Sequence, residues 1–112
     1  MTDPDFGVAV TVEDGATVVA VSGEVDLYTG PLLWERLSAV IETGSPRVVL
    51  DLKDMRFIDS TGVSVVVLAM RALQQRGGQL VLRSPCRMAS KLLELTGLSN
   101  LLEIQDDVAV AV

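Results

Sequence analysis

Two apolar segments in the middle of the chain predict different secondary structures. Residues 48–52 (Val-Val-Leu-Asp-Leu) are apolar without clean alternation, which is typical of a strand covered on both faces. Residues 63–76 begin with β-branched residues, which favour a strand, but continue into good helix formers. Helical spacing of the apolar positions and the stop at Gly77-Gly78 decide for a helix, its first half mostly buried. The expected stripe consists of Val63, Val66, Val67, Met70 and Leu73.

The turn between these segments reads Asp59-Ser60-Thr61-Gly62. Side-chain oxygens of Asp, Ser and Thr can accept hydrogen bonds from the free N–H groups at a helix start. Gly62 allows a neighbouring backbone or a partner to approach closely. These four residues alone fit an ordinary helix cap, and they also fit a hydroxyl presented for modification.

The N-terminal part of the chain predicts an antiparallel hairpin and then a helix. Residues 7–12 and 17–21 are expected to be strands on either side of an Asp-Gly turn, and residues 22–26 are expected to form a loop. Thr29 is expected to cap a helix with Pro31 in its first turn, and Gly44-Ser45-Pro46 ends it. The expected buried stripe consists of Leu33, Leu37, Val40 and Ile41. A loop at residues 53–56 follows the central strand.

The C-terminal part predicts a strand at residues 79–82 and a helix opened by Ser84-Pro85. Gly97 suggests a left-handed helix end, with Leu98 as its hydrophobic contact. A last short strand is expected at residues 101–104, and residues 106–112 form a final helical turn or two. The expected stripe of the helix consists of Met88, Leu92 and Leu95.

Strands that alternate with helices predict an α/β fold with parallel neighbours and helices packed on the sheet. We expect one domain over residues 1–112, with a small mixed β-sheet that starts from the hairpin. In such sheets, binding sites gather at the C-terminal ends of the parallel strands. The turn at residues 53–62 lies at such an end.

The composition of the chain argues against several classes of partner and of catalytic site. The formal net charge of −6 argues against nucleic acid and anionic membranes, and no segment reaches the length of a membrane span. The single cysteine, Cys86, fits a reducing cytoplasm. With no histidine, the chain has no Ser–His or Cys–His pair and no histidine metal ligand. We expect no enzyme, no cofactor and no bound metal.

Four motifs in order resemble those of the STAS domain family, and more closely its bacterial anti-sigma factor antagonists. The resemblance runs from about residue 8 to about residue 105 and implies a small mixed sheet with helices, as the pattern predicts. The motifs are Gly-Glu-Val-Asp-Leu-Tyr-Thr at 23–29, Asp-Ser-Thr-Gly at 59–62, Gly-Gly at 77–78 and Leu-Glu-Leu-Thr-Gly-Leu at 93–98.

The resemblance implies regulation of transcription by partner switching, as in stress responses. The serine after the motif aspartate, here Ser60, is phosphorylated by a partner that is both serine kinase and anti-sigma factor. Unphosphorylated antagonist binds this partner and frees the sigma factor, whereas phosphorylated antagonist does not bind. A metal-dependent serine/threonine phosphatase resets the switch.

The expected site therefore centres on Ser60, with Thr61 as the rival acceptor. The expected partner face consists of Asp26, Tyr28, Asp59, Ser60, Thr61 and Gly62. A phosphate at a helix start should not melt the helix, because free N–H groups and the helix dipole favour an anion. The effect should fall on the partner surface through bulk and repulsion. The free protein is expected to be a monomer.

Two other functions stay open from the sequence. Asp26, Asp51 and Asp59 could converge at one end of the sheet, with or without a divalent ion, as in a carboxylate-based enzyme. The chain could also be a non-switching STAS scaffold in a sensory or transport complex. The intact motif at residues 59–62 favours the switch.

Overall fold

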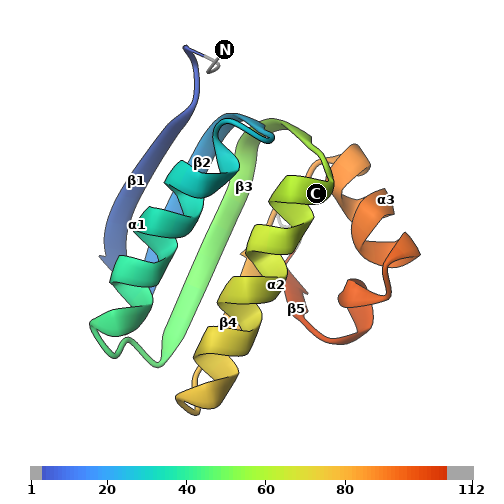
Figure 1. Ribbon diagram of the computed structural model, residues 1–112. Coiled ribbons are helices and arrows are strands. Elements are labelled where there is room, and N and C mark those ends of the chain that lie inside the picture. The colour runs from blue at the N-terminus through green and yellow to red at the C-terminus, as the bar shows by residue number, and fades with distance from the viewer. Residues whose placement is uncertain (1–3, 106–112) are drawn as a thin grey trace, which may run out of the picture.

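The computed structural model describes residues 4–105 as one mixed α/β unit (Figure 1). The strands are β1 (Gly7–Glu13), β2 (Ala16–Val25), β3 (Arg47–Ile58), β4 (Gln79–Arg83) and β5 (Glu103–Gln105). The helices are α1 (Gly30–Glu42), α2 (Ser60–Gln75) and α3 (Arg87–Leu95), followed by a 3₁₀ turn, η1 (Leu98–Asn100).

The five strands form one sheet in the order β1-β2-β3-β4-β5. β1 and β2 pair antiparallel, and every other neighbouring pair is parallel. The α/β class and the opening hairpin are thus confirmed. α1 and α2 lie side by side over one face of the sheet, and α3 lies beside its β4–β5 side (Figure 1).

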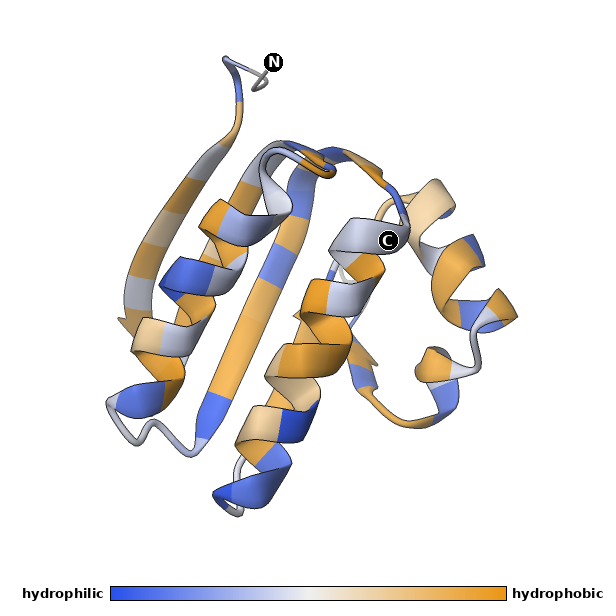
Figure 2. Cartoon of the chain, in the orientation of Figure 1, coloured by the Kyte–Doolittle hydropathy of each residue, from blue (hydrophilic) through white to orange (hydrophobic). Residues whose placement is uncertain are grey.

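The main core lies between the helices and the sheet. Its fully buried members include Val19 and Val21 of β2, Leu50 of β3 and Leu82 of β4. The predicted stripe of α1 is confirmed, because Leu33, Leu37, Val40 and Ile41 are all buried. Figure 2 shows apolar residues along the central strands and on the helices in front of them.

The opposite face of the sheet carries a second, smaller apolar cluster. It consists of Ala16, Val18, Val49 and Val81. The paired strands place two long-range ion pairs on this same face: Arg47 with Glu103 and Arg83 with Glu13. The long aliphatic stems of such arginines can cover apolar surface while their charged ends stay in water.

The two central strands are longer than predicted. Residues 22–26 and 53–56 were expected to be loops, but most of them extend β2 and β3. The two strands stay paired to Val25↔Ile58 by shifting register twice, and Met55 is only 2% exposed. β-bulges allow a polar segment without regular alternation to remain paired in a sheet. The local sequence pattern therefore did not show that these residues belong to strands.

Two predicted helix caps are wrong. Thr29 makes no cap hydrogen bond to α1, because its hydroxyl is buried and donates to the carbonyl of Glu24. Ser84 lies before α3 with a positive φ of 53°, and its N–H donates to the carbonyl of Gln105. The last strand starts two residues later than predicted, and the prediction for residues 106–112 lies outside the described residues.

The predicted stripe of α3 is also wrong. Met88 and Leu95 are 45% and 73% exposed, whereas Ala89 and Leu93 face the core. Leu92 is half-buried. The helix has apolar residues on two sides, and the side with Ala89 and Leu93 is the one that packs against the core.

The first half of α2 is buried on one side only. Val65 and Ala69 are buried, but the predicted Val63 and Val67 are half-buried and Leu68 is 47% exposed. The helix covers the sheet with one face, so a segment that is apolar all round leaves part of its surface in water. The helix ends as predicted, since Gly77 has a φ of 72° and the N–H of Gly78 donates to the Leu73 carbonyl.

Candidate functional site

The first turns of α1 and α2 meet at the end of the sheet where β2 and β3 finish. The N–H of Asp59 donates to the carbonyl of Val25 at 3.2 Å, which ties the start of α2 to the end of β2. A Cβ built on Gly30 would lie 2.9 Å from Cγ2 of Thr61, so the two helix starts are in close contact. The two motifs at residues 23–29 and 59–62 therefore form one surface.

Asp59 is the N-cap of α2. Its backbone is extended (φ −111°, ψ −169°), and Oδ1 accepts hydrogen bonds from the N–H groups of Thr61 at 2.9 Å and Gly62 at 3.2 Å. The N–H of Val63 donates to the Asp59 carbonyl. These three N–H groups are therefore not among the free donors that we expected to favour a phosphate at this helix start. Asp59 already satisfies them.

Ser60 is the first residue of α2 and is exposed. Its carbonyl accepts a hydrogen bond from the Ser64 hydroxyl at 3.0 Å, but within residues 4–105 its own hydroxyl makes none. Thr61 is half-buried, with its methyl group against Gly30. Ser60 therefore presents the more exposed hydroxyl of this turn.

Gly62 is buried beneath the first turn of α2. A Cβ at this position would lie 2.4 Å from Cγ1 of Ile58 and 3.0 Å from Cγ1 of Val25. The close approach that we expected at Gly62 is thus made by the ends of β2 and β3. Gly62 lets α2 dock against these strands, and so it positions Ser60.

Asp26 caps α1 in place of Thr29. Its Oδ1 accepts hydrogen bonds from the N–H groups of Tyr28 at 2.9 Å and Thr29 at 3.1 Å. These bonds hold the pKa of the Asp26 carboxyl below its usual range, the bond from Thr29 having the largest effect. The N–H of Asp26 in turn donates to the Thr29 hydroxyl, which is fully buried. Asp26 and Thr29 together make the loop after β2 rigid.

Exposed apolar side chains lie next to this loop. Tyr28, which the sequence placed on the partner face, is 57% exposed. Leu27 and Leu32 were not predicted there, yet they are 66% and 43% exposed. Leu27 was detectable from the sequence as an apolar residue in a loop, but its exposure depends on how the Asp26 turn is held. The site thus combines carboxylates, a free hydroxyl and an apolar border.

Asp51 does not join Asp26 and Asp59. It lies in the middle of β3 on the helix-free face, where its Oδ1 accepts a hydrogen bond from the Lys53 N–H at 3.1 Å. Asp59 lies eight positions after Asp51 along an extended segment, which amounts to about 25 Å. The three carboxylates therefore do not converge, and residues 4–105 contain no cluster of three potential metal ligands.

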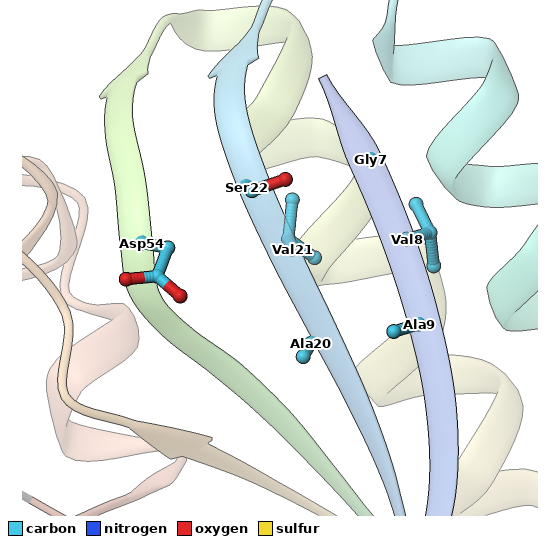
Figure 3. Close-up of a pocket in the computed structure, with 7 residues that line it drawn as sticks. All are labelled: Gly7, Val8, Ala9, Ala20, Val21, Ser22 and Asp54. Atoms are coloured by element: carbon cyan, nitrogen blue, oxygen red, sulfur yellow. The ribbon is translucent and has the colours of Figure 1, made fainter. Parts of the chain in front are cut away.

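A separate hollow of about 320 Å³ lies over β1, β2 and β3 (Figure 3), and Ser60 is not part of its lining. Small residues form most of its lining, including Gly7, Ala9 and Ala20, and Asp54 lies at one side. None of the predicted site residues lines it.

Across the described part of the chain, no helix is long and apolar enough to pass through a membrane.

The STAS domain family model matches residues 7–111. An anti-sigma-B factor antagonist of Bacillus subtilis is 31% identical over 100 residues, which cover 89% of this chain and 91% of the relative. A similar relative from Staphylococcus aureus, also an anti-sigma-B factor antagonist, is 29% identical over 106 residues. That match covers 95% of this chain and 98% of the relative.

A solved anti-sigma factor antagonist from Mycobacterium paratuberculosis has a TM-score of 0.81 and 30% identity, and the match covers 99% of this chain and 95% of that one. Bacillus SpoIIAA in its phosphorylated form has a TM-score of 0.71, and the match covers 95% and 96% of the two chains. Its identity of 22% shows the fold alone.

Proposed function

This chain belongs to the STAS domain family and to its anti-sigma factor antagonists, and we propose that it regulates transcription by phosphorylation of Ser60. In this proposal the unphosphorylated protein binds a cytoplasmic anti-sigma factor that is also a serine kinase, and so releases a sigma factor. Phosphorylation at Ser60 ends that binding, and a metal-dependent serine/threonine phosphatase restores it. The chain itself catalyses no step.

The free hydroxyl of Ser60 carries this proposal. A kinase must reach the acceptor hydroxyl without unfolding the substrate, and Ser60 is exposed with no hydrogen bond from its hydroxyl within residues 4–105. Thr61 is a poorer acceptor because its side chain packs against Gly30. Asp59 and Gly62 hold the turn through the cap and the close contact with Ile58.

The cap also explains how a phosphate would act. A phosphate adds roughly −1.5 to −2 charges at neutral pH. The nearby N–H groups of Thr61 and Gly62 are occupied by Asp59, so the phosphate would stand in solvent beside a carboxylate. The fold would change little, while the partner would meet added bulk and negative charge at the centre of its contact surface. A loss of about 1.4 kcal/mol in binding already weakens affinity tenfold.

Intact-mass measurement after incubation with ATP and lysate from the protein's own host tests the site. We expect a gain of one phosphate in wild type and in Thr61→Ala, and none in Ser60→Ala. Ser60→Ala should change the free energy of unfolding by less than about 0.5 kcal/mol, because the side chain is exposed and unbonded.

Loss of phosphate only in Thr61→Ala would keep the function and move the acceptor. No phosphate in wild type, in a lysate that phosphorylates other proteins, would favour the non-switching scaffold. Affinity capture of the kinase from the same lysate supplies the binding test. Wild type and Ser60→Ala should retain it, and Ser60→Asp should not.

A further inference from the structure

β1 is an unprotected edge of the sheet. Among the described residues it pairs with β2 alone, so one row of its backbone N–H and C=O groups faces outward (Figure 1). Natural edge strands are usually blocked by charge, proline or a bulge. Between Gly7 and Val12 this strand has no charged residue and no proline, and it pairs with β2 without a register shift.

The valines of β1 leave apolar surface at this edge. Val8, Val10 and Val12 pair with Val21, Val19 and Thr17 of β2, and so all three lie on the helix-covered face. Val10 and Val12 are nevertheless 38% and 78% exposed. Exposed valines beside an unpaired backbone row are suited to pairing with another strand.

We propose that this edge joins two copies of the chain, β1 to β1, in an antiparallel dimer with Val10 on the two-fold axis. Residues whose numbers add up to 20 then lie opposite one another: Val10 faces Val10, and Val8 faces Val12. A shift by one residue would place the valines of the two copies on opposite faces of the sheet. The register centred on Val10 keeps all six valines in one apolar strip.

The surroundings of Val8 fit this arrangement. A hollow of about 310 Å³ adjoins Val8 between β1 and α1 and is lined by Phe6, Leu32 and Arg36, among others. In the proposed register, Val12 of the second copy lies opposite Val8 and faces this hollow. Val12 of one copy thus meets the apolar side chains of Phe6, Val8 and Leu32 on the other, with Glu35 and Arg36 beside them, and the symmetry repeats the contact.

An ion pair between the two copies can form at the same place. Asp14 of the second copy would lie opposite Phe6, beside the hollow that Glu35 and Arg36 both line. Neither Asp14 nor Arg36 makes an ion pair within residues 4–105. Two symmetric Asp14–Arg36 pairs would form in the dimer, and such pairs select a register more than they add affinity. Ser60, at the start of α2, does not belong to this proposed contact between the two copies.

Disulfide trapping tests the register. Val10→Cys and Val12→Cys are each prepared with Cys86→Ser and oxidised at equal concentration. Paired positions of opposite strands have Cβ atoms about 5 Å apart, so Val10→Cys should form a covalent dimer. The two Val12 positions would be about 14 Å apart along the strands, too far for a disulfide, so Val12→Cys should stay monomeric.

If disulfides formed only by random collision, Val12→Cys would be trapped faster than Val10→Cys, because Val12 is the more exposed residue. Equal trapping of both variants, or faster trapping of Val12→Cys, would overturn the proposal. Sedimentation equilibrium gives an independent measurement. Wild type should associate reversibly, with the dimer weakened at least about tenfold by Val12→Lys or Arg36→Glu.

The control is Leu95→Lys, which adds a charge at an exposed leucine on α3. It should leave the dimer unchanged. Dissociation by Leu95→Lys but not by Val12→Lys would place the contact on α3, and wild type that stays monomeric up to about millimolar concentration would exclude the dimer. Circular dichroism must show that each variant is folded.

Discussion

Single residues position the Ser60 hydroxyl through close packing and capping. Gly62 leaves no room for a side chain between α2 and the ends of β2 and β3, and Asp59 fixes the first turn of the helix. Asp26 does the same for the neighbouring helix start. The residues around Ser60 thus have structural roles of their own, which mutagenesis of the partner surface must separate from binding.

Gly62→Ala should destabilise the protein by about 1–3 kcal/mol. The added methyl group would lie 2.4 Å from Cγ1 of Ile58, so the buried helix start must shift. Urea unfolding followed by circular dichroism measures the loss, with Gln74→Ala at an exposed position of α2 as the control. A Gly62→Ala variant as stable as wild type would show that α2 moves away at no cost.

The Asp26 carboxylate should stabilise the fold in a pH-dependent way. Its folded-state pKa lies below the usual value, so its stabilising effect is present above the unfolded pKa of about 4 and is lost as the pH falls through the folded pKa. The melting temperature of Asp26→Asn should therefore lie below that of wild type at pH 7. The two should converge in acid, and a gap that stays constant down to pH 2 would contradict this account.

At the scale of elements, α3 shows how a helix with two apolar sides can be misread. Its regular stripe predicts burial of Met88 and Leu95, but the sheet covers the side with Ala89 and Leu93. The stripe has the correct period, and the sequence cannot tell which side faces the sheet. The packing of α3 against β3 and η1 determines which side faces the sheet.

Leu93→Ala should cost about 2–5 kcal/mol of unfolding free energy, because Leu93 is only 3% exposed and a cavity would remain. Leu95→Ala, on the same helix, should stay within about 0.5 kcal/mol of wild type, since Leu95 is 73% exposed. Chemical denaturation of the two variants compares them directly. Equal losses would mean that α3 is turned differently on the sheet.

At the scale of the whole molecule, the packing predicts a single cooperative unit. The main core includes side chains from α1, α2, α3 and the sheet. The smaller cluster on the other face belongs to strands that also contribute to this core, so residues 4–105 do not divide into parts with separate cores. Small single domains of this size usually unfold in two states.

Trp34, the only tryptophan, reports on the packing of α1 against the core. Its fluorescence and the far-ultraviolet circular dichroism should give the same urea midpoint and the same slope, about 1–3 kcal/mol per molar urea. Two separate midpoints would show that α1 and the rest of the sheet unfold independently.

The sequence by itself determined the order of the elements, the α/β class and the place of Ser60 at a helix start. These features depend on local signals: apolar runs, the Asp-Gly turn at residues 14–15, and Asp59 as a cap before a long helical stripe. The capping of α2, the helix stop at Gly77-Gly78 and the left-handed Gly97 are confirmed, because each depends on neighbours within a few residues.

Only the tertiary structure decided the features that depend on a distant partner. β3 continues to Ile58 because β2 pairs with it across two register shifts. Thr29 turns inward because the carbonyl of Glu24 accepts its hydroxyl, and this leaves the cap of α1 to Asp26. Strand pairing and side-chain packing bring together residues far apart in the chain, so their outcome cannot be obtained from any one stretch of it.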